Sequence, residues 1–510
     1  MDVFVLLSLP SVFIFIFFLF RILSHRTKLA APPSPPSLPL IGNLHQLDHS
    51  SPHRSLWQLA KRHGPLMSLR LATLQTVVVS SARHAEQILK THDLNFANRP
   101  AFVGPAKLSY NGLDLGFAPY GPCWRELKKL SMVHLFSAHR VQSFRSVRED
   151  EVAQMVRKLS ERAASGTVVN LTEMLMSFTS SLICRIALGK SYVGELEEVV
   201  EKKKRRSRLQ VLLNEAQALL AEFFVSDYFP MMGWVDRVTG KTWRLEKTFK
   251  ELDAFYERVI FEHMAKNGDD DDEKEVKDII DILLQLLPNP SLSFHLTLDH
   301  IKALLMNIFI AGTDPSSATI VWAMTALLKD PEVMSMVQGE ARSLFGDKDF
   351  INEDDIERLP YLKAVVKETL RLFPPSPLLL PREATERCSI DGYEIEAKTV
   401  VYVNAWAIAR DPENWEKPEE FWPERFIGSE MELKGKEFEV LPFGSGRRMC
   451  PAKHMGMVNV ELGLANLVHS FDWEVGAGFD REEMLDTEVK PGITMHKKSD
   501  LYLVCKKRTT

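Results

Sequence analysis

Residues 441–452 read Leu-Pro-Phe-Gly-Ser-Gly-Arg-Arg-Met-Cys-Pro-Ala. This stretch holds one cysteine, Cys450, among residues that favour turns. Gly444 and Gly446 can adopt positive φ angles, which residues with a side chain reach only with strain. The stretch is therefore predicted to be a tightly turned loop that presents a single thiol.

The residues around Cys450 suit a flat ligand that carries a metal ion. Phe443 can wall one side of such a ligand, and Arg448 can meet a carboxylate on it. After Pro451, apolar residues recur with helical spacing as far as Val468. Cys450 would then lie at a helix N-terminus, where unpaired N–H groups and the helix dipole favour a thiolate. Such a thiolate suits the axial position of a haem iron, whereas the plain alternative is a small buried hydrophobic residue.

The pattern Phe-x-x-Gly-x-Arg-x-Cys-x-Ala in residues 443–452 resembles the haem-binding loop of the cytochrome P450 superfamily. Two upstream segments occur in the superfamily's order: Lys-Glu-Thr-Leu-Arg-Leu at 367–372 and Pro-Glu-Arg-Phe at 423–426. One departure is Ala452, where the superfamily usually has glycine. The resemblance implies a mainly α-helical cytochrome P450 fold with small β-sheets, and haem (heme b) bound through Cys450, its metal ligand.

Composition excludes several other classes of protein. The chain has 510 residues and a formal net charge of −5, which gives no reason to expect binding to nucleic acid. Its five cysteines are odd in number and widely scattered, so they do not form a disulfide framework. This usage fits a reducing, cytosolic environment.

The N-terminus is predicted to be a membrane anchor. Residues 3–20 carry no charge and are just long enough to cross a bilayer as one helix. Basic residues, beginning with Arg21, follow at once, so the rest of the chain should stay in the cytosol. A cleaved signal peptide is the alternative, but it would have basic residues before the apolar run, where this chain has Asp2.

We divide the chain into an anchor at 1–22, a basic and proline-rich hinge at 23–40, and a catalytic domain at 41–510. The prolines between Pro32 and Pro39 make a stiff spacer; an SH3-type ligand is the alternative reading. The hinge resembles the start of microsomal cytochromes P450, and it looks most like plant enzymes of specialised metabolism. This resemblance implies a single-pass protein of the endoplasmic reticulum membrane.

Short strands are predicted within 66–80, 388–394 and 400–403, and a helix is predicted over 124–140. Residues 98–122 lack periodicity and are predicted to form a long loop.

A long apolar helix is predicted from Thr297 to Leu328. The resemblance implies that it crosses the face of the haem where oxygen binds, and that Asp314, Pro315 and Ser316 are its catalytic positions. Threonine is expected where this chain has Pro315. Proline lacks both a hydroxyl and an N–H, so we expect a kink and altered control of protons. Asp314 is a candidate proton source, and the alternative is that ordered water replaces the missing hydroxyl.

The resemblance implies that residues outside the cysteine loop bind the haem propionates, and this chain has three candidates. Trp124 and Lys128 are four residues apart on a helix and share a face. In the superfamily the second of these is usually arginine, and lysine keeps the charge without the bidentate geometry. Arg382 is the third candidate.

The resemblance also implies a structural network on the haem side, built from Glu368, Arg371 and Arg425. Taken alone, a Glu/Arg pair three residues apart on a helix is usually a surface pair. A substrate pocket is expected to include Phe102, Phe117, Tyr120, Ile308, Ala311, Gly312, Leu378, Leu379, Ile493 and Thr494.

These features predict a haem-thiolate monooxygenase that acts on a small, largely apolar molecule. The resemblance implies O2 as co-substrate and electrons from NADPH through a membrane-bound cytochrome P450 reductase. Lys128, Lys129, Arg447 and Lys453 could form a positive face for that donor, or merely a solvated one. Two alternatives stay open: a haem-thiolate enzyme without oxygen insertion, through phenol coupling, dehydration or aldoxime conversion, and a non-catalytic membrane ligand carrier.

Overall fold

The computed structural model describes residues 31–191, 198–201, 204–266, 277–288, 294–429, 431, 433 and 435–508. The predicted anchor at 1–22 lies outside the described residues.

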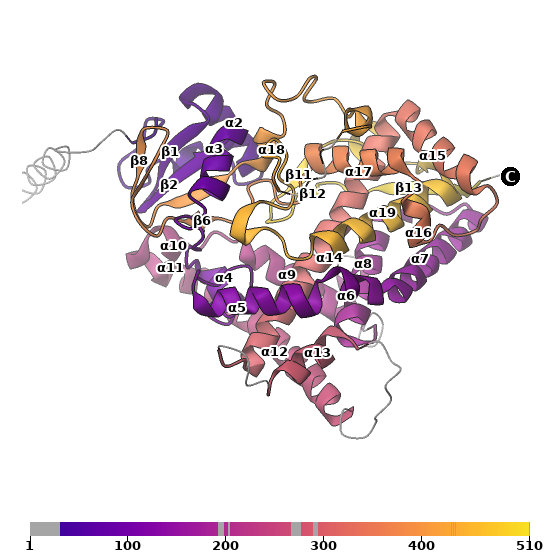
Figure 1. Ribbon diagram of the computed structural model, residues 1–510, viewed down its shortest axis with the longest axis horizontal. Helices are drawn as coiled ribbons and strands as arrows, with labels where there is room; N and C mark the ends of the chain where they lie inside the picture. The colour runs from indigo at the N-terminus through magenta and orange to yellow at the C-terminus, as the bar shows by residue number, and fades with distance from the viewer. Residues whose placement is uncertain are drawn as a thin grey trace, which may run out of the picture.

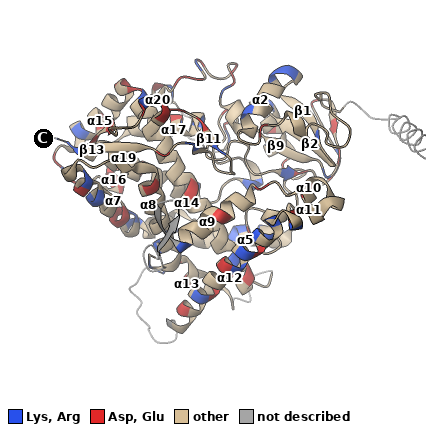
Figure 2. Ribbon diagram, turned by 180° about the vertical axis from the view of Figure 1, so that it is seen from behind, with Lys and Arg blue, Asp and Glu red and all other residues tan. Residues whose placement is uncertain are grey.

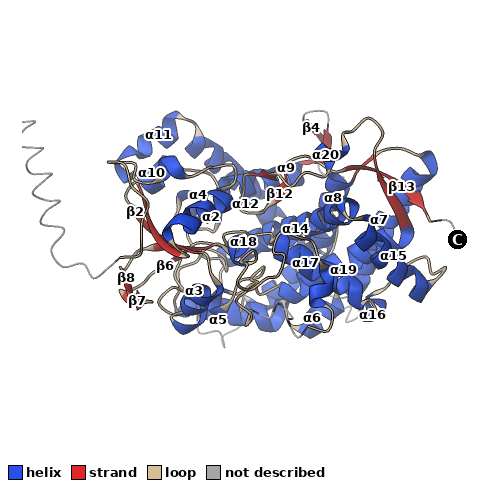
Figure 3. Cartoon of the chain, turned by 90° about the horizontal axis from the view of Figure 1, so that it is seen from above, coloured by secondary structure: helices blue, strands red, loops and turns tan. Residues whose placement is uncertain are grey.

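Helices make up most of the described chain, and the largest sheet lies at one end of it (Figure 1). Seen from above, strands β2 (Leu74–Val79) and β6 (Arg382–Glu383) lie at one end and β13 (Tyr502–Lys507) at the other, with helices between them (Figure 3). The predicted class, mainly α with small sheets, is confirmed.

The longer helices are α2 (Pro52–His63), α5 (Pro122–Leu130), α7 (Arg145–Ser165), α8 (Leu171–Leu188), α9 (Arg208–Leu220), α12 (Lys241–Lys266), α13 (Ile279–Leu286), α14 (Leu298–Lys329), α15 (Pro331–Phe345), α17 (Pro360–Leu372) and α19 (Lys453–Ser470). The shorter ones are α3 (Ala82–Glu86), α4 (Val103–Leu108), α6 (Ala138–Ser143), α10 (Val225–Tyr228), α11 (Gly233–Val238), α16 (Glu353–Ile356), α18 (Ala405–Ile408) and α20 (Arg481–Met484).

The main sheet has the order β1-β2-β9-β6, with β1 at Leu66–Leu71 and β9 at Val400–Val403. Strand β2 pairs antiparallel with β1 and parallel with β9. A second sheet has the order β10-β13-β3, with β10 at Phe471–Val475 and β3 at Val169–Asn170. Three hairpins complete the strands: β4 (Glu198–Glu201) with β5 (Lys204–Ser207), β7 (Cys388–Ile390) with β8 (Tyr393–Ile395), and β11 (Val489–Lys490) with β12 (His496–Lys497).

The cysteine loop lies between two hydrophobic clusters. Leu441, the first residue of the loop, packs into a cluster that includes residues of β2, β9 and α3. Met455, after it, packs into the main core, which α7, α8, α14, α17 and α19 all supply. Each fully buried leucine stabilises such a core by about 1.5–3 kcal/mol. Packing on both sides therefore fixes where the loop lies.

Helix α14 is the longest described helix and begins and ends where the sequence predicts. The hydroxyl of Thr297 accepts from the N–H of His300 at 3.4 Å, which caps the first turn. The helix then continues through Pro315 to Lys329. Both α8 and α14 are long and apolar enough to span a membrane, but 61% and 72% of their most apolar windows are buried, as in core helices.

The structure differs from the sequence expectations in two places. Residues 98–122 are not wholly loop, because α4 forms within them. The helix predicted over 124–140 is interrupted: a π-helical turn at Ser131–Leu135 follows α5, and α6 begins at Ala138.

The proline-rich residues 31–40 contact the main sheet. The N–H of Ser68, in β1, donates to the carbonyl of Pro33 at 2.8 Å, and its hydroxyl donates to that of Pro32 at 2.9 Å. The side chain of Asn43 donates to the carbonyl of Pro35 at 3.2 Å. This part of the predicted hinge is therefore attached to the catalytic domain.

Candidate functional site

Turns fix the position of Cys450 in its loop. Its N–H donates to the carbonyl of Phe443 at 3.0 Å. Gly444 and Gly446 have φ angles of 66° and 70°. A Cβ atom at Gly446 would lie 2.1 Å from the carbonyl oxygen of Leu89, so only glycine fits there. Cys450 is partly exposed, although its loop lies between two hydrophobic clusters.

The helix after the cysteine does not by itself favour a thiolate. Helix α19 begins at Lys453, with Ala452 as its N-cap, so Cys450 precedes the helix. Burial has the largest effect and raises the pKa of the Cys450 thiol, while the N–H of Ala452 and the charge of Lys128 act in the opposite direction. Coordination to a metal ion would favour the thiolate at this position.

Basic side chains gather beside the cysteine loop. Arg448 donates to the carbonyls of Ala97, Leu115 and Ala118 at 2.8, 3.2 and 2.6 Å. Trp124 donates to the same carbonyl of Leu115 at 3.0 Å. The predicted propionate ligands thus lie together, and here they bond to backbone oxygens.

Two more basic side chains beside the cysteine loop, Lys128 and Arg382, come from parts of the chain that are distant in the sequence. Lys128 donates to the carbonyl of Met449 at 3.3 Å and also to that of Arg447. Arg382 pairs with Asp93 at 3.0 Å and donates to the carbonyl of Ser445 at 3.0 Å.

Sequence reasoning missed Arg99, which joins the same group. It is 8% exposed and donates to the carbonyls of Leu380 and Pro381 at 2.8 and 2.6 Å. A lone arginine in an aperiodic segment gives no signal in the sequence.

This cluster fits an anionic ligand. Burial and neighbouring positive charge lower the pKa of Lys128 to about 8 and that of Arg448 to about 9. Asp93 pairs with Arg382, and the charge of Asp114 acts on Arg448, although burial raises the pKa of Asp114. Positive charge is therefore in excess, which two ligand carboxylates would offset. The donors here fit a haem, whose iron Cys450 would hold and whose propionates the cations would meet.

One face of α14 is accessible although the helix runs through the core. Ala311 is exposed and Pro315 is half-buried, whereas Thr313 and Asp314 are buried. Positions 311 and 315 are four residues apart and share a face. Two positions of the face predicted to meet a flat group are therefore accessible, and the role of that face remains a prediction.

Gly312 points elsewhere, contrary to the sequence expectation. A Cβ atom there would lie 2.8 Å from Ile183 of α8. Its small size therefore allows close packing of α8 on α14, and it does not clear space for a ligand.

The carboxylate of Asp314 is engaged by two side chains. Nε2 of His496 lies 2.8 Å from one of its oxygens, and the side-chain amide of Gln217 donates to the other. Ser316, the third predicted catalytic position, is 6% exposed. The role of Asp314 as a proton source remains a prediction.

The predicted structural network is assembled as expected. Arg371 donates twice to the carboxylate of Glu368, at 2.7 and 2.8 Å, and both side chains are fully buried. Arg425 donates to the same carboxylate at 3.2 Å, and the N–H of Trp422 donates to it at 2.9 Å. Arg371 also donates to the carbonyl of Ala409 at 2.6 Å. The trio therefore ties α17 to the segment before the cysteine loop.

A cavity lies among α4, the segment after α9, the residues before β6 and the turn before β12. Five predicted pocket residues line it: Phe102, Phe117, Leu378, Leu379 and Ile493. The other five, Tyr120, Ile308, Ala311, Gly312 and Thr494, are not among its lining residues. Tyr120 instead lies against Trp124, with ring centres 5.5 Å apart.

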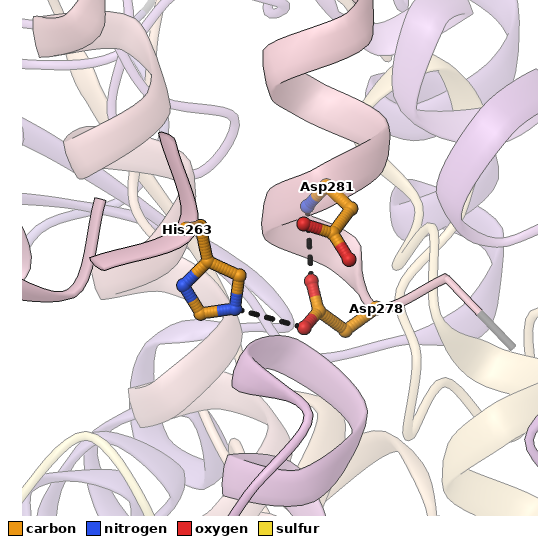
Figure 4. Close-up of side chains that lie close together, drawn as sticks. All are labelled: His263, Asp278 and Asp281. Carbon is orange, nitrogen blue, oxygen red and sulfur yellow. Dashed lines mark hydrogen bonds and ion pairs between the residues drawn. The ribbon is translucent and has the colours of Figure 1, made fainter. Parts of the chain in front are cut away.

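A separate polar cluster consists of His263, Asp278 and Asp281 (Figure 4). Its contacts have a structural explanation. Asp278 accepts from the N–H of Asp281 at 2.9 Å as the N-cap of α13, and its other oxygen meets His263 at 2.9 Å. The cluster therefore ties α12 to the start of α13.

The family follows from comparison with known proteins. The family model described as Cytochrome P450 matches residues 32–504. The chain belongs to the cytochrome P450 family. The family and its plant relatives make this P450 an oxidoreductase of the monooxygenase type, with haem-thiolate iron as its expected cofactor.

Its relatives include plant P450s across nearly the whole length. Cytochrome P450 71A9 of Glycine max is 47% identical over 92% of this chain and 92% of its own. Cytochrome P450 71B37 of Arabidopsis thaliana is 45% identical over 96% and 95%. 6,7,8-trihydroxycoumarin synthase of Pastinaca sativa is 44% identical over 99% and 98%.

A solved zebra fish cytochrome P450 with abiraterone has the same fold. It is 24% identical, covers 90% of this chain and 100% of its own, and superposes with a TM-score of 0.72.

Proposed function

We propose that this P450 oxidises a small, largely apolar plant specialised metabolite, using O2 and electrons passed from NADPH by a reductase. The observation that carries the proposal is that a cysteine and several basic side chains lie close together at the cysteine loop. A partly exposed Cys450 lies near four cations, Arg99, Lys128, Arg382 and Arg448, and near two carboxylates, Asp93 and Asp114. When bound, the haem supplies the oxygen-activating chemistry, which its thiolate ligand favours. The protein binds and orients the substrate and limits the entry of water.

The cavity lining supports an apolar substrate with a flat body. Phe102, Phe117 and Ile493 offer aromatic and aliphatic surface, and such surface orients ligands with few polar contacts. Two relatives are named 6,7,8-trihydroxycoumarin synthase and 5-OH-xanthotoxin synthase. Planar oxygenated aromatics are therefore the first substrate class to test.

A basic surface beside the loop supports docking of an acidic electron donor. Lys129 and Arg447 are exposed, while Lys128 is turned onto loop carbonyls. Figure 2 shows basic positions on α5. We therefore propose that a cytochrome P450 reductase, which receives its electrons from NADPH, binds to this face.

Exposed apolar residues support attachment to a membrane. Met231, Trp234 and Val238 are 95%, 60% and 78% exposed, and Leu40 is 83% exposed. The hydroxyl of Thr73, beside the N-terminal segment, donates to the carbonyl of Tyr228 at 2.7 Å, which joins the two apolar regions. We propose that this face lies on the endoplasmic reticulum membrane, with 1–22 as a single anchor and the catalytic domain in the cytosol.

A second candidate function rests on Pro315. A residue without a hydroxyl on the accessible face of α14 suits chemistry that needs little control of protons, such as phenol coupling. In that case the product would carry no oxygen atom from O2.

One experiment separates these functions. Full-length protein is reconstituted with reductase and lipid, and hydroxycoumarins and furanocoumarins are screened for a spectral shift of the haem. Ligands that bind are turned over under ¹⁸O2. Labelled product supports the monooxygenase, unlabelled coupled product supports the alternative, and binding without any turnover would support a ligand carrier.

A further inference from the structure

The carboxylate of Asp314, on α14, joins that helix to two elements whose neighbouring residues line the cavity. It lies on α14, is 3% exposed, and has a contact at each oxygen. His496 of β12 lies 2.8 Å from one oxygen, and Gln217 of α9 donates to the other. The same nitrogen of Gln217 lies 3.2 Å from the hydroxyl of Thr494. One carboxylate and one amide thus connect elements that are far apart in the sequence.

The two partners of Asp314 come from segments that line the cavity. Helix α9 ends at Leu220, and residues 220–222 are part of the lining. Strand β12 begins at His496, directly after the lining residues Ile493 and Met495. Movement of either segment away from α14 would therefore change the width of the cavity and break a contact of Asp314.

Burial makes these contacts costly to break. Hydrogen bonds to an ionised group are about twice as strong as those between neutral groups. A buried carboxylate that loses its donor also keeps the full cost of its desolvation. The side chain of His496 is less buried than that of Asp314, at 23% against 5% exposed.

We propose that Gln217 and His496 are positioning residues that hold α9 and the turn before β12 against α14 through Asp314, and so set the size of ligand that the cavity admits. This assigns the carboxylate a role separate from proton supply. It depends on the P450 family but not on the identity of the substrate.

A swap of hydrogen-bonding roles tests the proposal in the haem-loaded full chain. Gln217→Glu places two carboxylates together, while the double variant Gln217→Glu/Asp314→Asn restores a donor and an acceptor in reversed positions. Imidazole serves as a small probe and clotrimazole as a large one. Association and dissociation rates of both are followed by the absorbance of the haem, and thermal unfolding is measured in parallel.

For clotrimazole, we expect Gln217→Glu to raise both rate constants by about fivefold, the factor for one typical net hydrogen bond. The rates for imidazole should stay unchanged, and the double variant should return those for clotrimazole toward the original values. Unchanged clotrimazole rates in the single variant, or no return in the double variant, would overturn the proposal.

Two further variants keep the test decisive if Gln217→Glu fails to load haem. His496→Gln retains a donor and should leave clotrimazole binding unchanged, whereas His496→Leu removes the donor and should speed it. Equal rates in these two variants would also overturn the proposal.

Discussion

The guanidinium of Arg448 lies 4.1 Å from the centre of the Trp124 ring, and both side chains donate to the carbonyl oxygen of Leu115. This contact joins α5 to the cysteine loop, although the two residues lie far apart in the sequence. Cations stacked on aromatic rings are stabilised further when they are shielded from water. The contact with Trp124 and the shared carbonyl therefore hold Arg448 beside Cys450 through protein contacts alone.

Removal of Glu368 should unfold the haem side of the protein. Arg371 and Arg425 would lose the carboxylate that pairs them. Glu368→Ala should therefore cost about 3–5 kcal/mol in the free energy of unfolding, since it leaves buried charge unpaired. Denaturant unfolding and the ratio of haem to protein measure this effect.

The matched control is Glu357→Ala, which removes an exposed partner of Lys363. It should cost no more than about 1 kcal/mol. Stable, fully loaded Glu368→Ala protein with only slower turnover would show that the trio acts in chemistry and not in structure.

The alkaline stability of the haem-free protein should depend on Lys128. Burial lowers its pKa from 10.5 to about 8 in the folded chain. Between these values the unfolded chain binds more protons than the folded chain, so the Lys128 contribution makes the free energy of unfolding rise with pH. Lys128→Met should flatten that rise in urea unfolding between pH 8 and 10.

The same pH dependence of the free energy of unfolding is measured for the haem-loaded protein. Propionates would favour the charged lysine, so the rise with pH should shrink when haem is bound. The same rise with and without haem would argue against a propionate contact at Lys128.

Pro315→Thr should change how NADPH oxidation divides between product and leaked peroxide. Threonine adds a hydroxyl on the accessible face of α14 and an N–H that can bond four residues back. With a substrate found by the spectral screen, we expect the peroxide share to fall. NADPH consumed, peroxide formed and product formed are measured for both proteins.

Ser317→Ala is the control, because that hydroxyl donates to the backbone carbonyl of Asp314 at 2.9 Å and lies 3.7 Å from Met176 of α8. This variant should leave the ratio of peroxide formed to product formed, per NADPH consumed, unchanged. Identical ratios and products for Pro315→Thr would mean that ordered water already replaces the hydroxyl.

Local motifs predicted the parts of the site that lie close together in the sequence. The turn at Cys450 and the pair Glu368 and Arg371 each lie within a few residues, and their resemblance to motifs of the superfamily located them. The start of α14 at Thr297 was also predicted, because capping is a local preference.

The remaining contacts depend on tertiary packing that spacing cannot show. Arg99, Gln217 and His496 carry no local pattern, and each meets partners hundreds of residues away or on another element. The orientation of Gly312 depends on where α8 packs. At Cys450, burial raises the pKa of the thiol while the N–H of Ala452 lowers it, and only the second effect can be expected from the sequence.

The carbon monoxide difference spectrum of the reduced protein tests the central claim, that Cys450 is the haem ligand. The account predicts the thiolate-specific band in the original protein and its loss in Cys450→Ser. Cys505→Ser should keep the band, because that buried thiol bonds to the carbonyl of Leu159 at 3.5 Å. A thiolate band that survives in Cys450→Ser would contradict the account.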